Sequence, residues 1–238
     1  MTEILVQELG LIDYKTAWDY QEQLFKDAID KKIALRKGEA TSNPDNYILV
    51  CEHPHVYTLG KSGAQEHLLL SDERLKEVNA TYYKINRGGD ITYHGPGQLV
   101  VYPILDLEVF FTDIHKYMRY LEEAVILTLA EYGVKGMRVD GMTGVWIDGD
   151  TANARKICAL GVKSSRWVTM HGIGFNINTD LNYFNYIVPC GIEDKAVTSL
   201  EKELNRKVPI AEVADKLIHH LATLFEFTYI KNEREKIL

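Results

Sequence analysis

The pattern of apolar and polar positions predicts a few helices among many short strands. At 113–132, apolar side chains recur every three or four residues, the spacing of one buried helix face. Asp113 is a candidate N-cap, and Gly133 stands where a helix commonly ends. The same periodicity predicts further helices at 14–33, 72–78 and 210–224.

Short runs rich in β-branched and aromatic residues, bounded by glycines, predict the strands. These runs lie at 4–9, 47–51, 82–85, 99–105, 145–147, 156–162 and 168–177. Because strands cluster and helices interrupt them irregularly, the pattern favours an α+β fold over a repeating βαβ sheet. Since no stretch has the composition of a linker, we expect one domain over residues 1–238, with a split after Tyr132 as the alternative.

Composition narrows the class of protein. The chain has 238 residues, 46% of them hydrophobic, and carries a net charge of −7 without a continuous basic stripe, which argues against nucleic-acid binding. No apolar run approaches the roughly 20 residues that span a bilayer, and the first residues lack the features of a secretory signal. Three cysteines do not suggest a disulfide framework, so we expect reduced thiols, a cytoplasmic location and no membrane partner.

A glycine-rich segment, RGGDITYHGPGQ at 87–98, would let backbone amides approach a ligand closely. It lacks the G-x-G-x-x-G spacing of a dinucleotide site. Gly60, Lys61 and Ser62 resemble the end of a phosphate loop, but His55 stands where the first glycine of that loop belongs. The segment is therefore either a ligand-binding loop or a tight connection between two strands.

Histidines offer few metal ligands. Cys51, His53 and His55 alternate, so an extended backbone would place them on one face, as in half of a zinc site. Pro54 interrupts that strand and no second ligand pair follows, so we assign no metal site. His94 and His171 each stand beside a glycine, where they can line a pocket or bond to a loop carbonyl.

Cys190 and Lys156 are candidates for nucleophilic catalysis. Cys190 lies between Pro189 and Gly191, which fix a turn and leave room for a substrate to approach the sulfur. The alternative is a packed, unreactive thiol, since free cysteines are commonly buried. Lys156 precedes it in the segment KICALG at 156–161 and can serve as its partner.

Four segments together resemble the octanoyltransferases of lipoate biosynthesis in order and spacing. They are RGGDITYHGPGQ at 87–98, KICALG at 156–161, HGIGFN at 171–176 and IVPCGI at 187–192, and VTSL at 197–200 continues the match. The resemblance covers about residues 46–200. It implies an α+β domain related to biotin and lipoate protein ligases, with a mixed β-sheet flanked by helices.

The resemblance also implies a reaction and its partners. An octanoyl group would move from octanoyl-acyl carrier protein to a lysine of lipoyl domains in 2-oxoacid dehydrogenase complexes and of the glycine cleavage H protein, without a cofactor. Cys190 would hold the acyl group as a thioester, and Lys156 would tune the thiol. The implied acyl-pocket residues are Arg87, Gly88, Gly89, Asp90, Ile91, Thr92, Tyr93, His94, Ala159, Leu160, Gly161, Gly172, Ile173 and Gly174.

Two features of this assignment stay open at the level of sequence. Lys156 can act as an ammonium that stabilises the Cys190 thiolate, or as a neutral base that also deprotonates the incoming lysine. Cys158 departs from the family, which more often has a small residue there. On a regular strand Cys158 would share a face with Lys156, which allows a second thiol near the site; we expect Cys190 to be the nucleophile.

Two other functions compete with acyl transfer. An ATP-dependent lipoate-protein ligase of the same fold would use a pocket lysine but no cysteine nucleophile, so Cys190 favours the transferase. A non-catalytic acyl-binding module would not need both Lys156 and Cys190. Because acyl carrier proteins and lipoyl domains are usually acidic, we also expect a basic patch drawn from Lys61, Lys84, Lys163 and Arg166.

Overall fold

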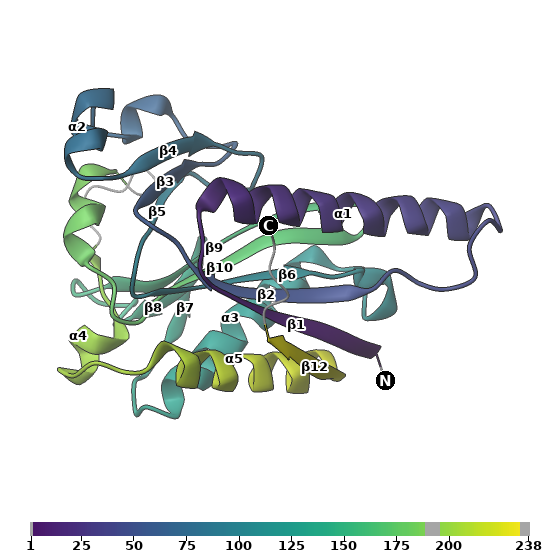
Figure 1. Ribbon diagram of the computed structural model, residues 1–238. Helices are drawn as coiled ribbons and strands as arrows, with labels where there is room; N and C mark the ends of the chain where they lie inside the picture. The colour runs from purple at the N-terminus through teal and green to yellow at the C-terminus, as the bar shows by residue number, and fades with distance from the viewer. Residues whose placement is uncertain (1, 189–195, 234–238) are drawn as a thin grey trace.

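The chain adopts an α+β fold in a computed structural model that describes residues 2–188 and 196–233. A large mixed sheet has helix α1 (Tyr14–Arg36) on one face and helices α3 (Ile114–Ala130) and α5 (Ile210–Phe225) on the other. A smaller sheet lies at one side of the large one, beside the short helix α2 (Asp72–Glu77) (Figure 1). The expected fold class is therefore confirmed.

The large sheet is antiparallel through its centre and parallel at one edge. Its order is β12 (Phe227–Glu233), β1 (Thr2–Leu11), β2 (Asn46–Glu52), β6 (Gln98–Ile104), β10 (Val168–Asn176), β9 (Arg155–Ser165), β8 (Met142–Ile147) and β7 (Met137–Val139). Only the β12–β1 and β1–β2 pairs among these are parallel. Because β6 pairs with β10, a domain boundary after Tyr132 would cut through the sheet.

The small sheet places the glycine-rich segment. Its order is β4 (Thr81–Lys84), β3 (Val56–Leu59) and β5 (Ile91–His94), with β3 and β5 antiparallel. Strand β5 lies inside the glycine-rich segment, so this segment is neither only a loop nor only a tight connection. The two-residue strand β11 (Ala196–Val197) pairs in parallel with Arg155 and Lys156 of β9, and α4 (Leu200–Leu204) follows it.

Alternation along the central strands creates two cores. Val100 and Tyr102 face α1 and pack with its Phe25. Leu99 and Val101 point the opposite way and pack in the core that α3 and α5 cover. This period of two is what a strand buried on both faces requires. Among the described helices, none is both long and apolar enough to span a membrane.

The sequence pattern locates the longer elements and misses several short ones. Helices α1, α2, α3 and α5 lie where periodicity predicts them, and the Asp113 carboxylate caps α3 by accepting from Lys116 N at 3.0 Å. Strands β3, β5, β7 and β11 have two to four residues each, too few for a periodic pattern. Strand β12 was also not predicted, because its sequence FTYIKNE mixes apolar and charged positions.

Candidate active site

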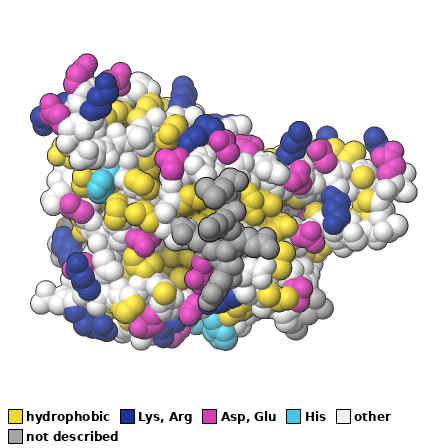
Figure 2. Space-filling model, in the orientation of Figure 1, with side chains coloured by type: hydrophobic (Ala, Val, Ile, Leu, Met, Phe, Trp, Pro, Cys, Tyr) yellow, Lys and Arg dark blue, Asp and Glu magenta, His cyan; other side chains and the backbone are white. Residues whose placement is uncertain are grey.

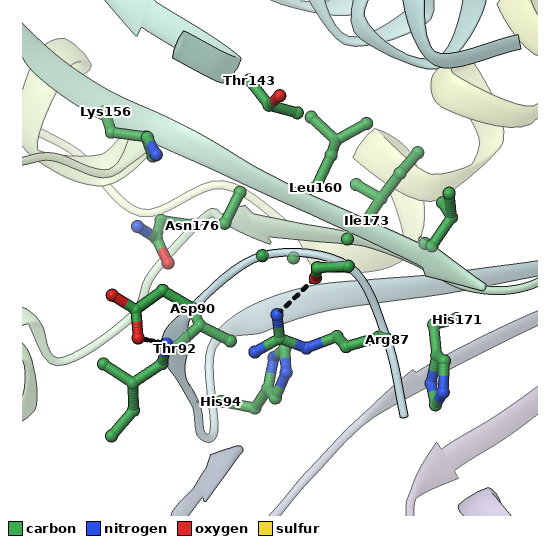
Figure 3. A pocket seen from close by; sticks show the side chains of 18 of the residues that line it. Arg87, Asp90, Thr92, His94, Thr143, Lys156, Leu160, His171, Ile173 and Asn176 are labelled. Atoms are coloured by element: carbon green, nitrogen blue, oxygen red, sulfur yellow. Dashed lines mark hydrogen bonds between the residues drawn. The ribbon is translucent and has the colours of Figure 1, made fainter. Parts of the chain in front are cut away.

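A cavity of about 530 Å³ lies between the glycine-rich segment and strands β8, β9 and β10. Lys156 lines it, together with every pocket residue that the family resemblance implies except Tyr93 (Figure 3). Tyr93 is fully buried and packs with Tyr57 on the other side of β5, where its hydroxyl lies 2.7 Å from His55 Nδ1. Segments far apart in the sequence thus converge as the motifs predict.

Hydrogen bonds fasten the glycine-rich segment to both sheets. The buried Arg87 guanidinium donates to Thr58 O at 2.8 Å in β3 and to Gly88 O at 2.9 Å. Gly88 N donates to Val162 O of β9 at 2.9 Å. A Cβ at Gly161 would lie only 2.9 Å from Gly88 O, so glycine is needed where the segment crosses β9.

A β-bulge in β9 separates Lys156 from Cys158. Trp146 of β8 pairs with Lys156 and Val145 pairs with Cys158, which leaves Ile157 as an extra residue on β9. The expectation that Lys156 and Cys158 share a face is therefore wrong, because the bulge breaks the period-two alternation. Lys156 lines the cavity, whereas Cys158 is fully buried in the core and burial raises the pKa of its thiol.

Cys190 lies outside the described residues, within 189–195, as do Pro189 and Gly191. The chain on either side of that segment is placed. Val188 N donates to His67 O at 2.9 Å, and Ala196 and Val197 line the cavity while pairing with Arg155 and Lys156. The residues that follow the segment therefore run alongside Lys156.

A buried chain of hydrogen bonds sets the state of His94. Asn176 Nδ2 donates to Thr198 O at 3.0 Å, and Gln98 Nε2 donates to Asn176 Oδ1 at 2.9 Å. Because a carbonyl oxygen can only accept, these bonds orient both amides and leave Gln98 Oε1 to accept from His94 Nδ1 at 2.6 Å. Burial lowers the pKa of His94 to about 3, so the ring is neutral and its Nε2 is an acceptor.

His171 lies at the opposite end of the cavity from Lys156 in Figure 3. Its backbone is left-handed, with φ at +60°, and its N–H donates to Gln21 Oε1 at 3.0 Å. Burial, with smaller contributions from the charges of Arg87 and Lys163, lowers the pKa of His171 to about 3. Within the described part of the chain, His171 Nε2 and Gln21 Nε2 are buried without a hydrogen-bond partner.

The alternating Cys51, His53 and His55 do not converge on a metal position. His53 is held between Ile12 O at 2.8 Å and the Tyr102 hydroxyl at 2.7 Å, and burial lowers its pKa to about 4. His55 lies beyond the end of β2 and bonds to Tyr93 instead. Across residues 2–188 and 196–233, no group of three or more His, Cys, Asp or Glu side chains could hold a metal ion.

Several cavity residues carry no sequence signal of their own. Trp146 lies in none of the segments that carry the family resemblance, and its pairing with β9 brings it to the cavity. Gln98 and Asn176 end two of those segments but were not assigned to the pocket, and the pairing of β6 with β10 brings them together. The basic residues also differ from expectation, because Lys163 bonds to Glu22 at 2.8 Å and is only 18% exposed. Lys61, Lys84 and Arg166 are exposed, and basic and acidic side chains are interspersed over the face shown in Figure 2.

Comparison with known proteins places the chain in a family. The model of the lipoyl protein ligase A/B catalytic domain matches residues 13–222. A protein of Cytophaga hutchinsonii named octanoyltransferase is 62% identical over 96% of this chain and 95% of its own length. An octanoyltransferase of Christiangramia forsetii is also 62% identical, over 94% of this chain and 96% of its own.

Solved structures agree at the level of the fold. A bipartite lipoate protein ligase from Thermoplasma acidophilum has a TM-score of 0.71 at 16% identity, covering 100% of this chain and 89% of that one. A biotin protein ligase from Aquifex aeolicus has a TM-score of 0.50 at 15% identity, covering 94% and 70%. The chain therefore belongs to the lipoyl protein ligase A/B catalytic-domain family and, within it, to the octanoyltransferases, which are transferase enzymes.

Proposed function

We propose that this enzyme moves an octanoyl group from octanoyl-acyl carrier protein to a lysine of a lipoyl domain, through a thioester on Cys190. The observation that carries the proposal is the position of Lys156, which lines the cavity and pairs with strand β11. Strand β11 comes directly after the segment that contains Cys190. Relatives at 62% identity that are named octanoyltransferase support the choice of acyl group.

The first half-reaction exchanges one thioester for another. The Cys190 thiolate attacks the carbonyl carbon of the octanoyl thioester, a bond forms to Sγ, and the bond to the carrier sulfur breaks. Lys156, starting as an ammonium, gives its Nζ proton to the departing carrier thiolate. Because bond types are conserved, the step needs no ATP.

The second half-reaction forms the amide. The amine of the acceptor lysine attacks the Cys190 thioester, the carbon–sulfur bond breaks, and the Cys190 thiolate is restored. The neutral Lys156 takes the proton that the amine loses and returns to an ammonium. Lys156 would therefore serve as counter-ion before the first step and as base in the second.

The cavity wall suits an apolar chain. Met118, Leu160 and Ile173 supply apolar surface to the cavity, and the rings of His94 and His171 are neutral. Each methylene buried contributes about 0.8 kcal/mol, so the wall can bind an acyl tail without a cofactor. The acceptors proposed are the lipoyl domains of 2-oxoacid dehydrogenase complexes and the glycine cleavage H protein.

Substrate dependence tests this function. The enzyme should octanoylate a lipoyl domain when given octanoyl-acyl carrier protein without ATP, followed as a mass gain of the domain. Octanoic acid with ATP and Mg²⁺ should give no product. A reaction that needs ATP and the free acid would instead identify a ligase.

A further inference from the structure

We propose that Trp146 is the positioning residue for Lys156, whose ammonium group it holds against the face of its indole ring. The inference rests on the proposed function of Lys156 and adds a residue through which that function is achieved. Lys156 Nζ lies 4.6 Å from the centroid of the Trp146 ring. At that distance an ammonium is attracted to the electron-rich face of the ring, whereas a neutral amine gains little.

Pairing between strands fixes the ring in place. Trp146 lies in register with Lys156 on one side and with Met137 of β7 on the other. Val145 and Ile147, its neighbours on β8, point into the core, so Trp146 faces the cavity. The side chain is only 3% exposed, which makes the contact with Lys156 largely desolvated and stronger than one on the surface.

Gly144 completes the support by leaving room for the lysine stem. A Cβ at this position would lie 3.4 Å from Lys156 Cε, 3.5 Å from Cδ and 2.6 Å from Cys158 O, and its φ is +115°. Gly144 N donates to Glu122 Oε1 at 3.0 Å, which ties this part of β8 to α3. Glu122 is itself buried and paired with Arg119 at 2.8 Å and Arg138 at 3.1 Å.

The consequence for the reaction is that Lys156 is oriented before substrate arrives. A free lysine side chain samples many rotamers, and holding one of them removes that entropy cost from the chemical step. Trp146 would therefore affect the rate of acyl transfer more than the docking of either protein substrate.

A series of ring replacements tests the proposal. Trp146→Phe keeps an aromatic face and should stay within about threefold of wild-type kcat, whereas Trp146→Leu should lower kcat about tenfold. KM for the carrier protein and for the lipoyl domain should change less than twofold in both variants. Trp146→Met, whose unbranched side chain can extend into part of the space of the ring, repeats the comparison if the Leu variant does not fold; thermal melts establish folding.

The background of Lys156→Met separates positioning from a structural role. If Trp146 acts through Lys156, Trp146→Leu should cause no further loss there. Equal activity of the Phe and Leu variants, or a full additional loss in the Lys156→Met background, would overturn the proposal. Wild-type activity of Lys156→Met alone would instead overturn the proposed function of Lys156, and this inference with it.

Discussion

The two ends of the cavity differ in their titratable groups, and strand β9 runs past both. The lysine end, formed by Trp146 and Lys156, holds an amine on an aromatic face. The histidine wall, formed by His94 and His171, holds two imidazoles whose pKa values burial lowers to about 3. His171 pairs with Val162, six positions beyond Lys156 on β9, so the backbones of His171 and Lys156 are roughly 20 Å apart. His94 lies nearer to Lys156, against Gly174, which pairs with Ala159.

The difference shows how one cavity can serve both an apolar chain and a proton transfer. At the lysine end, where the proposed reaction moves a proton, the amine of Lys156 can carry a charge, whereas both histidine rings stay neutral. The Arg87 guanidinium lies beside these rings, but its hydrogen bonds to Thr58 O and Gly88 O hold it within the glycine-rich segment. Strand β9 sets both conditions: its bulge at Ile157 turns Lys156 into the cavity, and Gly161 lets the glycine-rich segment pack beside it. Changes at the two ends should therefore have different effects.

The largest effect is expected at the lysine end. Lys156→Arg keeps the positive charge but neither releases nor takes up a proton near neutral pH. Acylation should slow, because the carrier thiolate must take its proton from water, and turnover should fall further, by about 10²–10⁴-fold, because the acceptor amine has no base; the acyl-enzyme should therefore accumulate. Rapid-quench mass spectrometry measures both quantities. Lys163→Arg, on the same strand but paired with Glu22, is the matched control and should retain turnover. Fast transfer to the lipoyl domain by Lys156→Arg would remove its role as base.

The buried histidines should instead make folding sensitive to acid. The pKa values of His53, His94 and His171 are lowered to about 4, 3 and 3, so the unfolded chain binds protons that the native state does not. Each of these histidines should lower the free energy of unfolding by about 1.4 kcal/mol per pH unit as pH falls below about 6.5. Urea unfolding between pH 7 and 4.5 measures this slope.

A pair of histidine variants assigns that slope. His94→Gln should reduce the slope by about 1.4 kcal/mol per pH unit, the contribution of one proton, because glutamine does not titrate. His219→Gln, on the exposed face of α5, should leave the slope unchanged. Equal slopes in wild type and His94→Gln would mean that His94 is not held neutral.

The hydrogen bonds that link His94, Gln98 and Asn176 should make a smaller contribution to the stability of the fold. Gln98→Leu leaves the Nδ1–H of His94 and the Oδ1 of Asn176 without partners, which should cost about 3 kcal/mol. Denaturant unfolding at pH 7.5 measures the loss. Gln23→Leu, at an exposed position of α1, should change stability by less than about 0.5 kcal/mol. Equal stabilities of the two variants would show that the chain of bonds contributes nothing.

The smallest effect is expected outside the cavity. Lys61 and Lys84 are exposed near the glycine-rich segment, so reversing both to Glu should raise KM for acidic protein substrates about threefold at low salt. The effect should shrink at physiological salt, as steady-state kinetics at two ionic strengths would measure. Charge reversal of the exposed Lys37 and Lys207 to Glu is the control, and it should leave KM unchanged. An unchanged KM at low salt would exclude Lys61 and Lys84 from the docking surface.

The sequence predicts those parts of the site that depend on local chemistry. Glycine-rich segments mark places where backbones approach closely, and Gly88 and Gly89 line the cavity. Gly161 and Gly174 also line it, but the family resemblance, not a local pattern, points to them. The regular apolar spacing of α3 likewise gives its position within two residues at either end. Both signals are contained within a few consecutive residues, so a single chain is enough to detect them.

Features that depend on strand pairing could not be predicted. The side to which Lys156 points is decided by a bulge against β8, which no pattern within 156–162 reveals. The tautomer of His94 depends on Gln98 and, through it, on Asn176, which lies 78 positions beyond Gln98 in the chain. Trp146 would be taken for an ordinary strand residue until β8 pairs with β9. Each of these follows from contacts between segments rather than from the residues in one of them.

The most direct test of the account is the mass of the intact protein after incubation with octanoyl-acyl carrier protein in the absence of ATP and acceptor. Wild type and Cys158→Ser should each gain one octanoyl group, because the Cys158 thiol is buried in the core. Cys190→Ser should gain no thioester-linked group that hydroxylamine removes. An octanoyl group on Cys190→Ser that hydroxylamine removes at neutral pH, where it cleaves thioesters but not serine esters, or its loss from Cys158→Ser alone, would contradict the assignment of Cys190 as nucleophile.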